Sequence, residues 1–216
     1  MRALLVILFL GLTSTAFADN DADCKKGSGK ACMAIAEAEK DDARAYEYYQ
    51  KACAAKLVAG CTEQAQRLMD GTGVTKDEKA AFAMWEKACK AKDGRACNNL
   101  GTSWSDGNQG ASDVDHGKAR TYYDKACKLG NSFGCYNLGN VYRLGEGLKP
   151  NPKLAVGFFT KSCALDNPKG CTELGIMYYE GKVIPKNAAK ALELFDKSCK
   201  LGSDVGCKNH KLLTGG

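Results

Sequence analysis

The twelve cysteines of this chain are spaced with a regularity that restricts its architecture to a repeat protein. They form six pairs, and the two members of each pair are eight positions apart. From Cys53 onward, the first members of successive pairs are 36, 38, 36 and 36 residues apart. Self-similarity at a fixed period of this length is the sequence signature of a solenoid, in which each unit packs only on its neighbours.

Three residue types recur at fixed distances before the first cysteine of a pair. From Cys53 onward, an alanine stands eight positions before the cysteine, an aromatic residue four before it and a lysine two before it, as in Ala119, Tyr123 and Lys125 ahead of Cys127. Residues four apart share one face of a helix, and a cation is favoured in the last helical turn. The pattern predicts a helix that ends in Lys-Ala-Cys or Lys-Ser-Cys.

A second helix is predicted to begin after each second cysteine. The residue four positions after that cysteine is small in five of the six cases, at Ala36, Ala65, Gly101, Gly139 and Gly175, and is Lys211 in the C-terminal cap. Glycine inside a helix costs about 1 kcal/mol relative to alanine, so we expect the backbone of a packed helix to approach closely there. A glycine ten positions after the cysteine, at Gly71, Gly107, Gly145 and Gly181, is placed to end the helix.

The two helices together predict an all-α fold, an α-solenoid of helix-turn-helix repeats of about 36 residues. We expect a short N-terminal repeat or cap at 19–57, repeats at 58–93, 94–131, 132–167 and 168–203, and a C-terminal cap at 204–216. The first unit is short because only 21 positions separate Cys32 from Cys53, and the repeat at 94–131 has two extra residues around 108–110.

The first eighteen residues are expected to be a cleaved signal peptide. They contain Arg2, an apolar run from Ala3 to Leu12 that is too short to span a bilayer, and an Ala16-Phe17-Ala18 end. Cleavage after Ala18 predicts a secreted or periplasmic protein that does not insert into a membrane.

Several motifs resemble those of a known family. The Leu-Gly-x-x-Tyr core at 138–142, the Gly145-Glu-Gly147 loop and the helix ending in Lys-Ala-Cys or Lys-Ser-Cys are similar to Sel-one-like repeats, relatives of tetratricopeptide repeats. The paired cysteines resemble the Helicobacter cysteine-rich protein family, secreted repeat proteins often labelled β-lactamase-like. The resemblance covers about residues 24 to 210 and implies the helical repeat fold.

The cysteine pairs are interpreted as local disulfides. Cysteines at the facing ends of consecutive antiparallel helices can approach within bonding distance, and an exported chain meets an oxidising environment. The predicted bonds are Cys24–Cys32, Cys53–Cys61, Cys89–Cys97, Cys127–Cys135, Cys163–Cys171 and Cys199–Cys207. A thiolate array for copper(I) or zinc and a redox-active dithiol are the alternatives, but the chain has no Cys-x-x-Cys pair.

No catalytic residue, metal site or cofactor is predicted. The family label implies β-lactamase or penicillin-binding activity, yet the chain has no Ser-x-x-Lys, Ser-Asp-Asn or Lys-Thr-Gly motif. Two histidines, His116 and His210, are too few for a zinc hydrolase, and the acidic cluster at Asp106, Asp113 and Asp115 is interpreted as helix-entry chemistry. A Gly-x-Ser-x-Gly match at 130–134 lies between two cysteines of a helical repeat, where no strand-to-helix elbow is expected.

The remaining hypothesis is a binding scaffold, with the helix after each second cysteine lining a concave groove. The expected ligand is a protein, a peptide or a cell-wall-derived fragment such as one of peptidoglycan, and a β-lactam is the family-implied alternative. The net charge of +6 comes without a run of like charge, so nucleic acid is not expected, and the protein is expected to be a monomer. The candidate ligand-binding residues are Asn99, Tyr136, Asn137, Asn140, Arg143, Glu173 and Tyr179.

Overall fold

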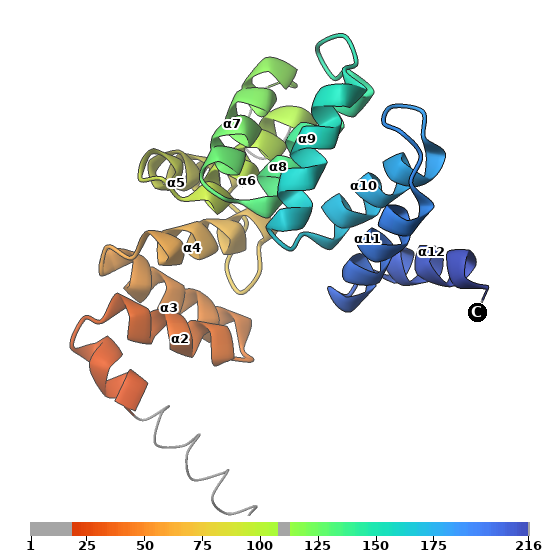
Figure 1. Ribbon diagram of the computed structural model, residues 1–216. Coiled ribbons are helices and arrows are strands. Elements are labelled where there is room, and N and C mark those ends of the chain that lie inside the picture. Colours follow the sequence, from red (N-terminus) through yellow and green to blue (C-terminus); the bar gives the residue numbers. More distant parts are fainter. Residues whose placement is uncertain (1–18, 108–112, 216) are drawn as a thin grey trace, which may run out of the picture. The chain divides into compact units, whose positions relative to one another are not determined.

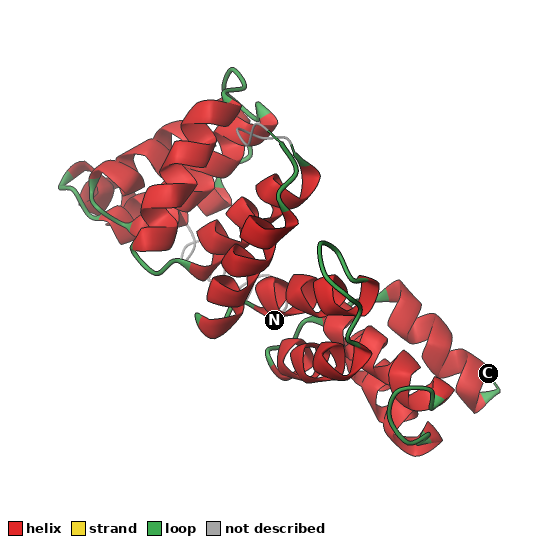
Figure 2. Cartoon of the chain, turned by 90° about the horizontal axis from the view of Figure 1, so that it is seen from above, coloured by secondary structure: helices red, strands yellow, loops and turns green. Residues whose placement is uncertain are grey.

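A computed structural model of the chain describes residues 19–107 and 113–215. The expected signal peptide at 1–18 and the insertion around Asn108 lie outside the described residues. Within the described ranges every regular element is a helix and no strand occurs (Figure 2). The predicted fold class, an α-solenoid of helix-turn-helix repeats, is confirmed. No helix among the described residues is both long and apolar enough to cross a bilayer.

Residues 19–25 are helical, and consecutive helices follow with short links (Figure 1). In chain order they are α2 Gly29–Ala38, α3 Asp42–Ala54, α4 Val58–Asp70, α5 Glu78–Lys90, α6 Gly94–Asp106, α7 His116–Lys128, α8 Ser132–Leu144, α9 Pro152–Ala164, α10 Pro168–Glu180, α11 Ala188–Lys200 and α12 Asp204–Thr214. They divide into two compact units, the first ending at Asp93 and the second beginning at Gly94. We call these unit one, with α2–α5, and unit two, with α6–α12.

The helices after the second cysteines begin earlier than the sequence pattern indicates. We expected them to begin after the cysteine, but α8 begins at Ser132, three residues before Cys135. The reason is the N-cap: the side chain of Asn131 accepts a hydrogen bond from the backbone N–H of Gly134, so the helix is already capped ahead of the cysteine. Both cysteines of a pair therefore lie inside helices, and only three residues join α7 to α8.

The repeated alanines and aromatic residues form the core. The alanines eight positions before the first cysteines are almost completely buried, and so are the aromatic side chains four positions before them. The aromatic set is Tyr49, Trp85, Tyr123, Phe159 and Phe195. The repeated lysine lies in the last turn of its helix, as expected from the helix dipole, for example Lys125 in α7.

The glycine inside the second helix has a different neighbour from the one predicted. We expected the backbone of a packed helix to approach it, but the nearest atoms to a Cβ at Gly101, Gly139 or Gly175 belong to the aromatic ring of the next helix. The close approach of backbone occurs instead at the residue before the second cysteine. A Cβ on Gly134, for example, would lie 2.5 Å from the Cβ of Ala126 and 3.0 Å from the backbone nitrogen of Cys127.

The helix ends agree with the sequence pattern. Gly71, Gly145 and Gly181 are left-handed C-caps of α4, α8 and α10, as predicted from their position ten residues after the cysteine. The short first unit is explained by its link, because three residues join α2 to α3 whereas seven join α8 to α9.

Disulfides join the helices of consecutive repeats. The structure has the bonds Cys24–Cys32, Cys53–Cys61, Cys127–Cys135, Cys163–Cys171 and Cys199–Cys207, with Cα–Cα distances of 4.4 to 4.7 Å. Cys89 and Cys97 are also disulfide-bonded. These distances lie within the ordinary range for a disulfide, so the three-residue turn between the helices holds the cysteines at bonding distance.

Candidate functional site

Six of the seven candidate residues line a series of cavities in unit two. The cavities lie along α6, α8, α10 and α12, the helices that carry the second cysteines. Their lining repeats at two, five and eight positions after the cysteine, as with Asn137, Asn140 and Arg143 after Cys135. Positions three apart lie on one face of a helix, so this spacing presents the same stripe of each helix to the cavities.

The first cavity, of about 250 Å³, lies between α6, α7 and α8. Its lining is mostly polar and consists of Ser105, Tyr123, Tyr136, Asn137, Asn140, Arg143, Leu144 and Glu146. The side-chain amide of Asn137 donates to the carbonyl oxygen of the Asn98 side chain across to α6, at 2.9 Å. Arg143 donates through its guanidinium to Asn140 Oδ1 at 3.1 Å, so two candidate residues hold each other in place.

Tyr123, on α7, also lines this cavity. Only 5% of the residue is exposed, and its hydroxyl lies 3.3 Å from the hydroxyl of Thr102 on α6. Burial disfavours the charged phenolate and raises the pKa of Tyr123 above its ordinary value. The phenol therefore acts as a neutral hydrogen-bonding group in this cavity.

The second cavity, of about 230 Å³, lies between α8 and α10. Arg143 also lines this cavity and lies near Glu173, with 3.9 Å between Nε and Oε2. The side chains of both residues are partly exposed, so this long ion pair contributes little to stability and leaves polar groups available at the surface.

The third cavity, of about 330 Å³, lies between α10, α11 and α12 and is mostly apolar. Its lining consists of Ile176, Tyr179, Phe195, Asn209, Leu212 and Leu213. Tyr179 is 45% exposed, and the ammonium group of Lys186 lies 5.3 Å from the centre of its ring. Leu212 is 70% exposed, which is unusual for a large apolar side chain.

The three cavities are adjacent because they share lining residues. Arg143 lines the first and the second, and Ile176 lines the second and the third. We call them together the cavity row. Its lining changes along the chain from amides, through the Arg143–Glu173 pair, to apolar side chains.

Sequence reasoning identified one part of this lining and missed another. Asn99 does not line any of the three cavities; it is half-buried on α6, and its side-chain oxygen lies 3.5 Å from the amide nitrogen of Asn98. The missed residues are Ser105, Tyr123, Leu144 and Glu146 in the first cavity, and Ile176 and Leu212 further along the row. The available signal was the equal spacing of the three lining positions after each second cysteine.

The aspartate, histidine and serine of the remaining motifs lie at helix starts. Asp115 is the N-cap of α7; its carboxylate accepts from the backbone N–H of Lys118, and this hydrogen bond lowers the pKa of Asp115. His116 is the first residue of α7 rather than part of the preceding loop. Ser132 begins α8, and its backbone oxygen accepts from the Ser162 hydroxyl, so the Gly-x-Ser-x-Gly match is not a strand-to-helix elbow. The described residues contain no group of three or more metal-ligating side chains.

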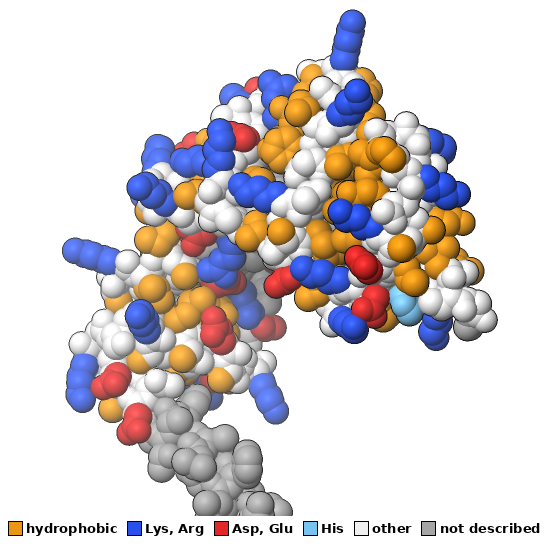
Figure 3. Space-filling view, viewed as in Figure 1, with side chains coloured by type: hydrophobic (Ala, Val, Ile, Leu, Met, Phe, Trp, Pro, Cys, Tyr) orange, Lys and Arg blue, Asp and Glu red, His pale blue; other side chains and the backbone are white. Residues whose placement is uncertain are grey.

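Charged side chains are distributed rather than clustered. On the visible face of each unit, lysine and arginine side chains are scattered among apolar and uncharged ones (Figure 3). A single basic patch of the kind that attracts nucleic acid is not visible on that face.

Comparison with known proteins places these features in a family. A model of the Sel1 repeat matches residues 36–57, 61–93, 94–131, 132–167 and 168–203. A Sel1 repeat protein from Oxalobacter formigenes is similar, with 24% sequence identity and a TM-score of 0.77 over 85% of this chain and 77% of that one. Cysteine rich protein B from Helicobacter pylori is 33% identical, with a TM-score of 0.51 over 62% of this chain and 95% of that one.

The immunity protein Pa5087 from Pseudomonas aeruginosa is also similar, with 19% identity and a TM-score of 0.61 over 87% of this chain and 80% of that one. At this level of identity, the Oxalobacter and Pseudomonas structures support the fold alone. The chain matches none of the curated proteins with which it was compared.

Proposed function

Because the chain belongs to the Sel1 repeat family, whose members are protein-interaction scaffolds, we propose that the cavity row of unit two binds an extended peptide segment of a partner protein. The observation that carries this proposal is the sharing of Arg143 and Ile176 between neighbouring cavities, which makes them one row along the same helical stripe. Sel1 repeat scaffolds are generally not enzymes, and the proposed function involves no chemical step.

The chemistry of the row matches an extended peptide. The amide side chains of Asn137 and Asn140 offer both donors and acceptors, which suit the backbone N–H and C=O groups of an extended chain. At the other end, Ile176 and Leu212 offer an apolar cavity for one large side chain, next to the exposed ring of Tyr179. The preferred peptide is therefore polar toward α6 and carries an apolar anchor toward α12.

The spacing of the repeats sets the length of the segment. Packed helices lie about 8 to 10 Å apart, and an extended chain advances about 3.3 Å per residue, so one step of the row takes about three residues. Three cavities correspond to a segment of about nine residues. A peptidoglycan fragment is the alternative ligand, and its stem peptide is shorter than the segment that the three cavities would hold.

The location of the protein follows from its disulfides. Multiple disulfides indicate an extracytoplasmic location, because cytoplasmic thiols are kept reduced. We propose that residues 1–18 direct the export and that the mature chain begins at Asp19 as a monomer. The intact mass of the exported protein before and after reduction, with analytical ultracentrifugation, tests all three statements.

The peptide proposal can be tested with a phage-displayed library of random dodecapeptides. We expect enriched peptides to bind the purified protein, and the single changes Asn140→Ala and Arg143→Ala to weaken binding about tenfold each, as measured by isothermal titration calorimetry. Matched controls are Thr160→Ala and Lys153→Ala, which change exposed residues of α9 that do not line the row.

The outcome also decides between this proposal and the alternative. Equal affinity of the peptides for all four variants would place the binding site elsewhere, and failure to enrich any peptide would contradict the proposal. The alternative, β-lactamase or penicillin-binding activity, is tested by hydrolysis of a chromogenic cephalosporin on the same sample. Turnover that persists through purification and is lost with a single side-chain change would replace the scaffold function with an enzyme.

A further inference from the structure

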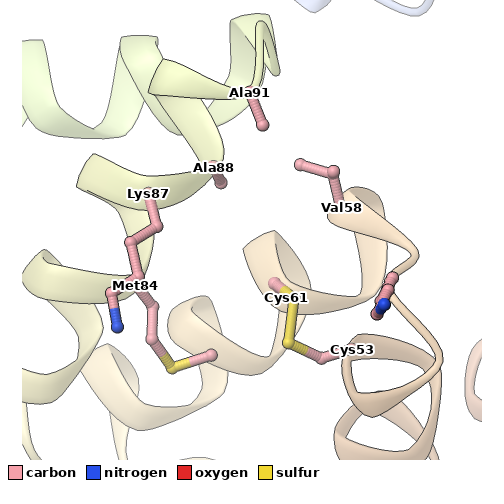
Figure 4. Close-up of a pocket in the computed structure, with 8 residues that line it drawn as sticks. Cys53, Val58, Cys61, Met84, Lys87, Ala88 and Ala91 are labelled. Carbon is pink, nitrogen blue, oxygen red and sulfur yellow. A yellow bond between two sulfur atoms is a disulfide. The ribbon is translucent and has the colours of Figure 1, made fainter.

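Unit one contains a larger cavity than any of the three in the cavity row. Its volume is about 490 Å³, and it lies between α5 and the turn that joins α3 to α4. Most of its wall is apolar: Met84 reaches from α5 toward the Cys53–Cys61 disulfide, with Ala91 and Val58 on the remaining sides (Figure 4). This volume is in the range of sites that hold small molecules.

The only charged side chains in the described lining are two lysines, Lys56 and Lys87. Both are exposed, and no carboxylate of the described residues forms an ion pair with either of them. Lys56 has a left-handed backbone conformation, with φ of 63°, in the turn between α3 and α4. The cavity is thus an apolar space whose described lining includes two lysines and no carboxylate.

The corresponding place in the last repeat, taken together with the α9–α10 turn that precedes it, differs in charge. Every lining residue has a counterpart 110 positions later, so Lys56 corresponds to Asp166 and Lys87 to Lys197. There, Lys197 Nζ lies 2.8 Å from Asp166 Oδ1 and also donates to the backbone oxygen of Cys163 at 2.9 Å. The last repeat therefore supplies its own carboxylate, whereas unit one has a second lysine in that position.

A second difference concerns the size of two lining side chains. Ala91 corresponds to Leu201, and leucine is also found at this register at Leu129 and Leu165. Ala88 corresponds to Ser198, whose hydroxyl donates to the backbone oxygen of Pro168 at 2.8 Å. At the corresponding positions, unit one has a lysine in place of Asp166 and an alanine in place of Leu201.

We propose that this cavity binds a small amphipathic anion from solution, an alkyl carboxylate. Its carboxylate lies between the ammonium groups of Lys56 and Lys87, in the position that the Asp166 carboxylate has beside Lys197. Its alkyl chain covers Met84 and the Cys53–Cys61 disulfide, beside the small side chain of Ala91. Charge-assisted hydrogen bonds fix the head, and removal of apolar surface from water adds affinity for the tail.

The test uses decanoate as the probe, added to the full mature chain below its critical micelle concentration and followed by isothermal titration calorimetry. We expect saturable binding of one molecule per chain, about tenfold weaker binding of decanol, and no binding of decyltrimethylammonium. Octanoate is expected to bind about tenfold to fifteenfold more weakly than decanoate, because two methylene groups fewer are buried. Higher salt is expected to weaken binding of the anion.

Two variants are taken from the last repeat of the chain itself. Lys56→Asp restores the carboxylate beside a lysine, and Ala91→Leu restores the leucine, so both are expected to fold and each to weaken decanoate binding about tenfold or more. Lys79→Asp and Ala83→Leu make the same chemical changes at exposed positions of α5 outside the cavity, and they are expected to leave the affinity unchanged.

Circular dichroism and thermal unfolding establish that each variant is folded, and Lys56→Gln replaces Lys56→Asp where that variant is not. The absence of saturable decanoate binding would overturn the proposal. It would also be overturned by equal binding of decanol, or by undiminished binding to folded Ala91→Leu. Because the cavity lies in unit one, these results are independent of peptide binding by the cavity row.

Discussion

The ring of Phe159 occupies the space in which a side chain on Gly139 would lie, since a Cβ built there would be 2.6 Å from the ring carbon Cε1. The same relationship joins Gly101 to Tyr123 and Gly175 to Phe195. Two features of the repeat are thereby connected: the small residue four positions after the second cysteine receives the aromatic side chain of the following helix. The absence of a side chain is required by packing rather than by backbone conformation.

In Gly139→Ala the added methyl group overpacks the core against Phe159, which costs about 1 to 3 kcal/mol. Alanine regains about 1 kcal/mol as a better helix former than glycine. We therefore predict that the free energy of unfolding falls by up to about 2 kcal/mol. Urea unfolding followed by circular dichroism measures the change.

Gly157→Ala is the matched control for this substitution. Gly157 is exposed in α9, and nothing lies within 4 Å of a Cβ built there, so alanine is expected to raise the free energy of unfolding by about 0.5 to 1 kcal/mol. Stabilisation by both substitutions would show that the ring of Phe159 moves aside at little cost and would contradict the packing argument.

The sequence pattern predicted the fold because its constraints are local and repeated. Alanine, an aromatic residue and lysine at fixed distances before a cysteine define the face, the core and the end of a helix. What the pattern did not predict was which group fills the space over Gly139, since that depends on the crossing of α8 and α9. The helix starts were missed for a similar reason, because an N-cap such as Asn131 is recognised with certainty only when its hydrogen bond is seen.

Part of the candidate site was predictable, although the polar residues Ser105 and Glu146 were missed along with apolar ones. Asn137 and Arg143 were identified because no packing role explained them. Ile176 and Leu212 were missed because they are apolar, as core residues are. The cavity beside Cys53–Cys61 is lined by Lys56 and Ala91, which correspond to Asp166 and Leu201 later in the chain. Those differences are visible in the sequence, but their meaning depends on knowing that the two positions face one cavity.

A second prediction concerns the disulfides. The double change Cys127→Ala/Cys135→Ala is expected to lower the free energy of unfolding by about 2 to 3 kcal/mol, because the bond restricts the unfolded chain. In a solenoid each repeat contacts only its neighbours, so amide hydrogen exchange should accelerate in α7 and α8 more than in α11 and α12. A uniform acceleration over all helices of unit two would contradict this local effect.

A third prediction concerns the turn residue three positions after the first cysteine. Lys92 has a φ of 68° there, whereas the equivalent positions at Gly130 and Gly202 are glycines with φ of 82° and 89°. Lys92→Gly is expected to raise the free energy of unfolding by up to about 1 kcal/mol, because the left-handed conformation strains a residue with a Cβ.

Asp166→Gly is the comparison for Lys92→Gly. It relieves the strain of the same left-handed conformation, in which Asp166 has a φ of 57°. It also removes the exposed ion pair with Lys197, which contributes up to about 1 kcal/mol to the free energy of unfolding. Its effect on unfolding is therefore expected to be close to zero. Urea unfolding of both variants tests the difference, and equal stabilisation would show that the ion pair contributes nothing.

A fourth prediction follows from the buried phenol of Tyr123 in the first cavity of the row. Burial raises its pKa, so the folded chain keeps the phenolic proton at a pH at which the unfolded chain has lost it. This contribution to stability is fully present below the pKa of the unfolded state, about 10, and is lost as the pH rises toward the folded pKa. The free energy of unfolding should therefore fall over that range, by up to about 1.4 kcal/mol per pH unit from this group.

Tyr123→Phe has no phenolic proton and should lose less stability between about pH 9 and about pH 11 than the wild-type chain. Urea unfolding at several pH values measures both curves, and the lysines and the other tyrosines contribute equally to each. The hydroxyl contact with Thr102, at 3.3 Å, is also removed, but that loss shifts the curve without changing its slope. Parallel curves would show that Tyr123 ionises alike in the folded and unfolded chains, and would contradict its role as a neutral group beneath Asn140 and Arg143.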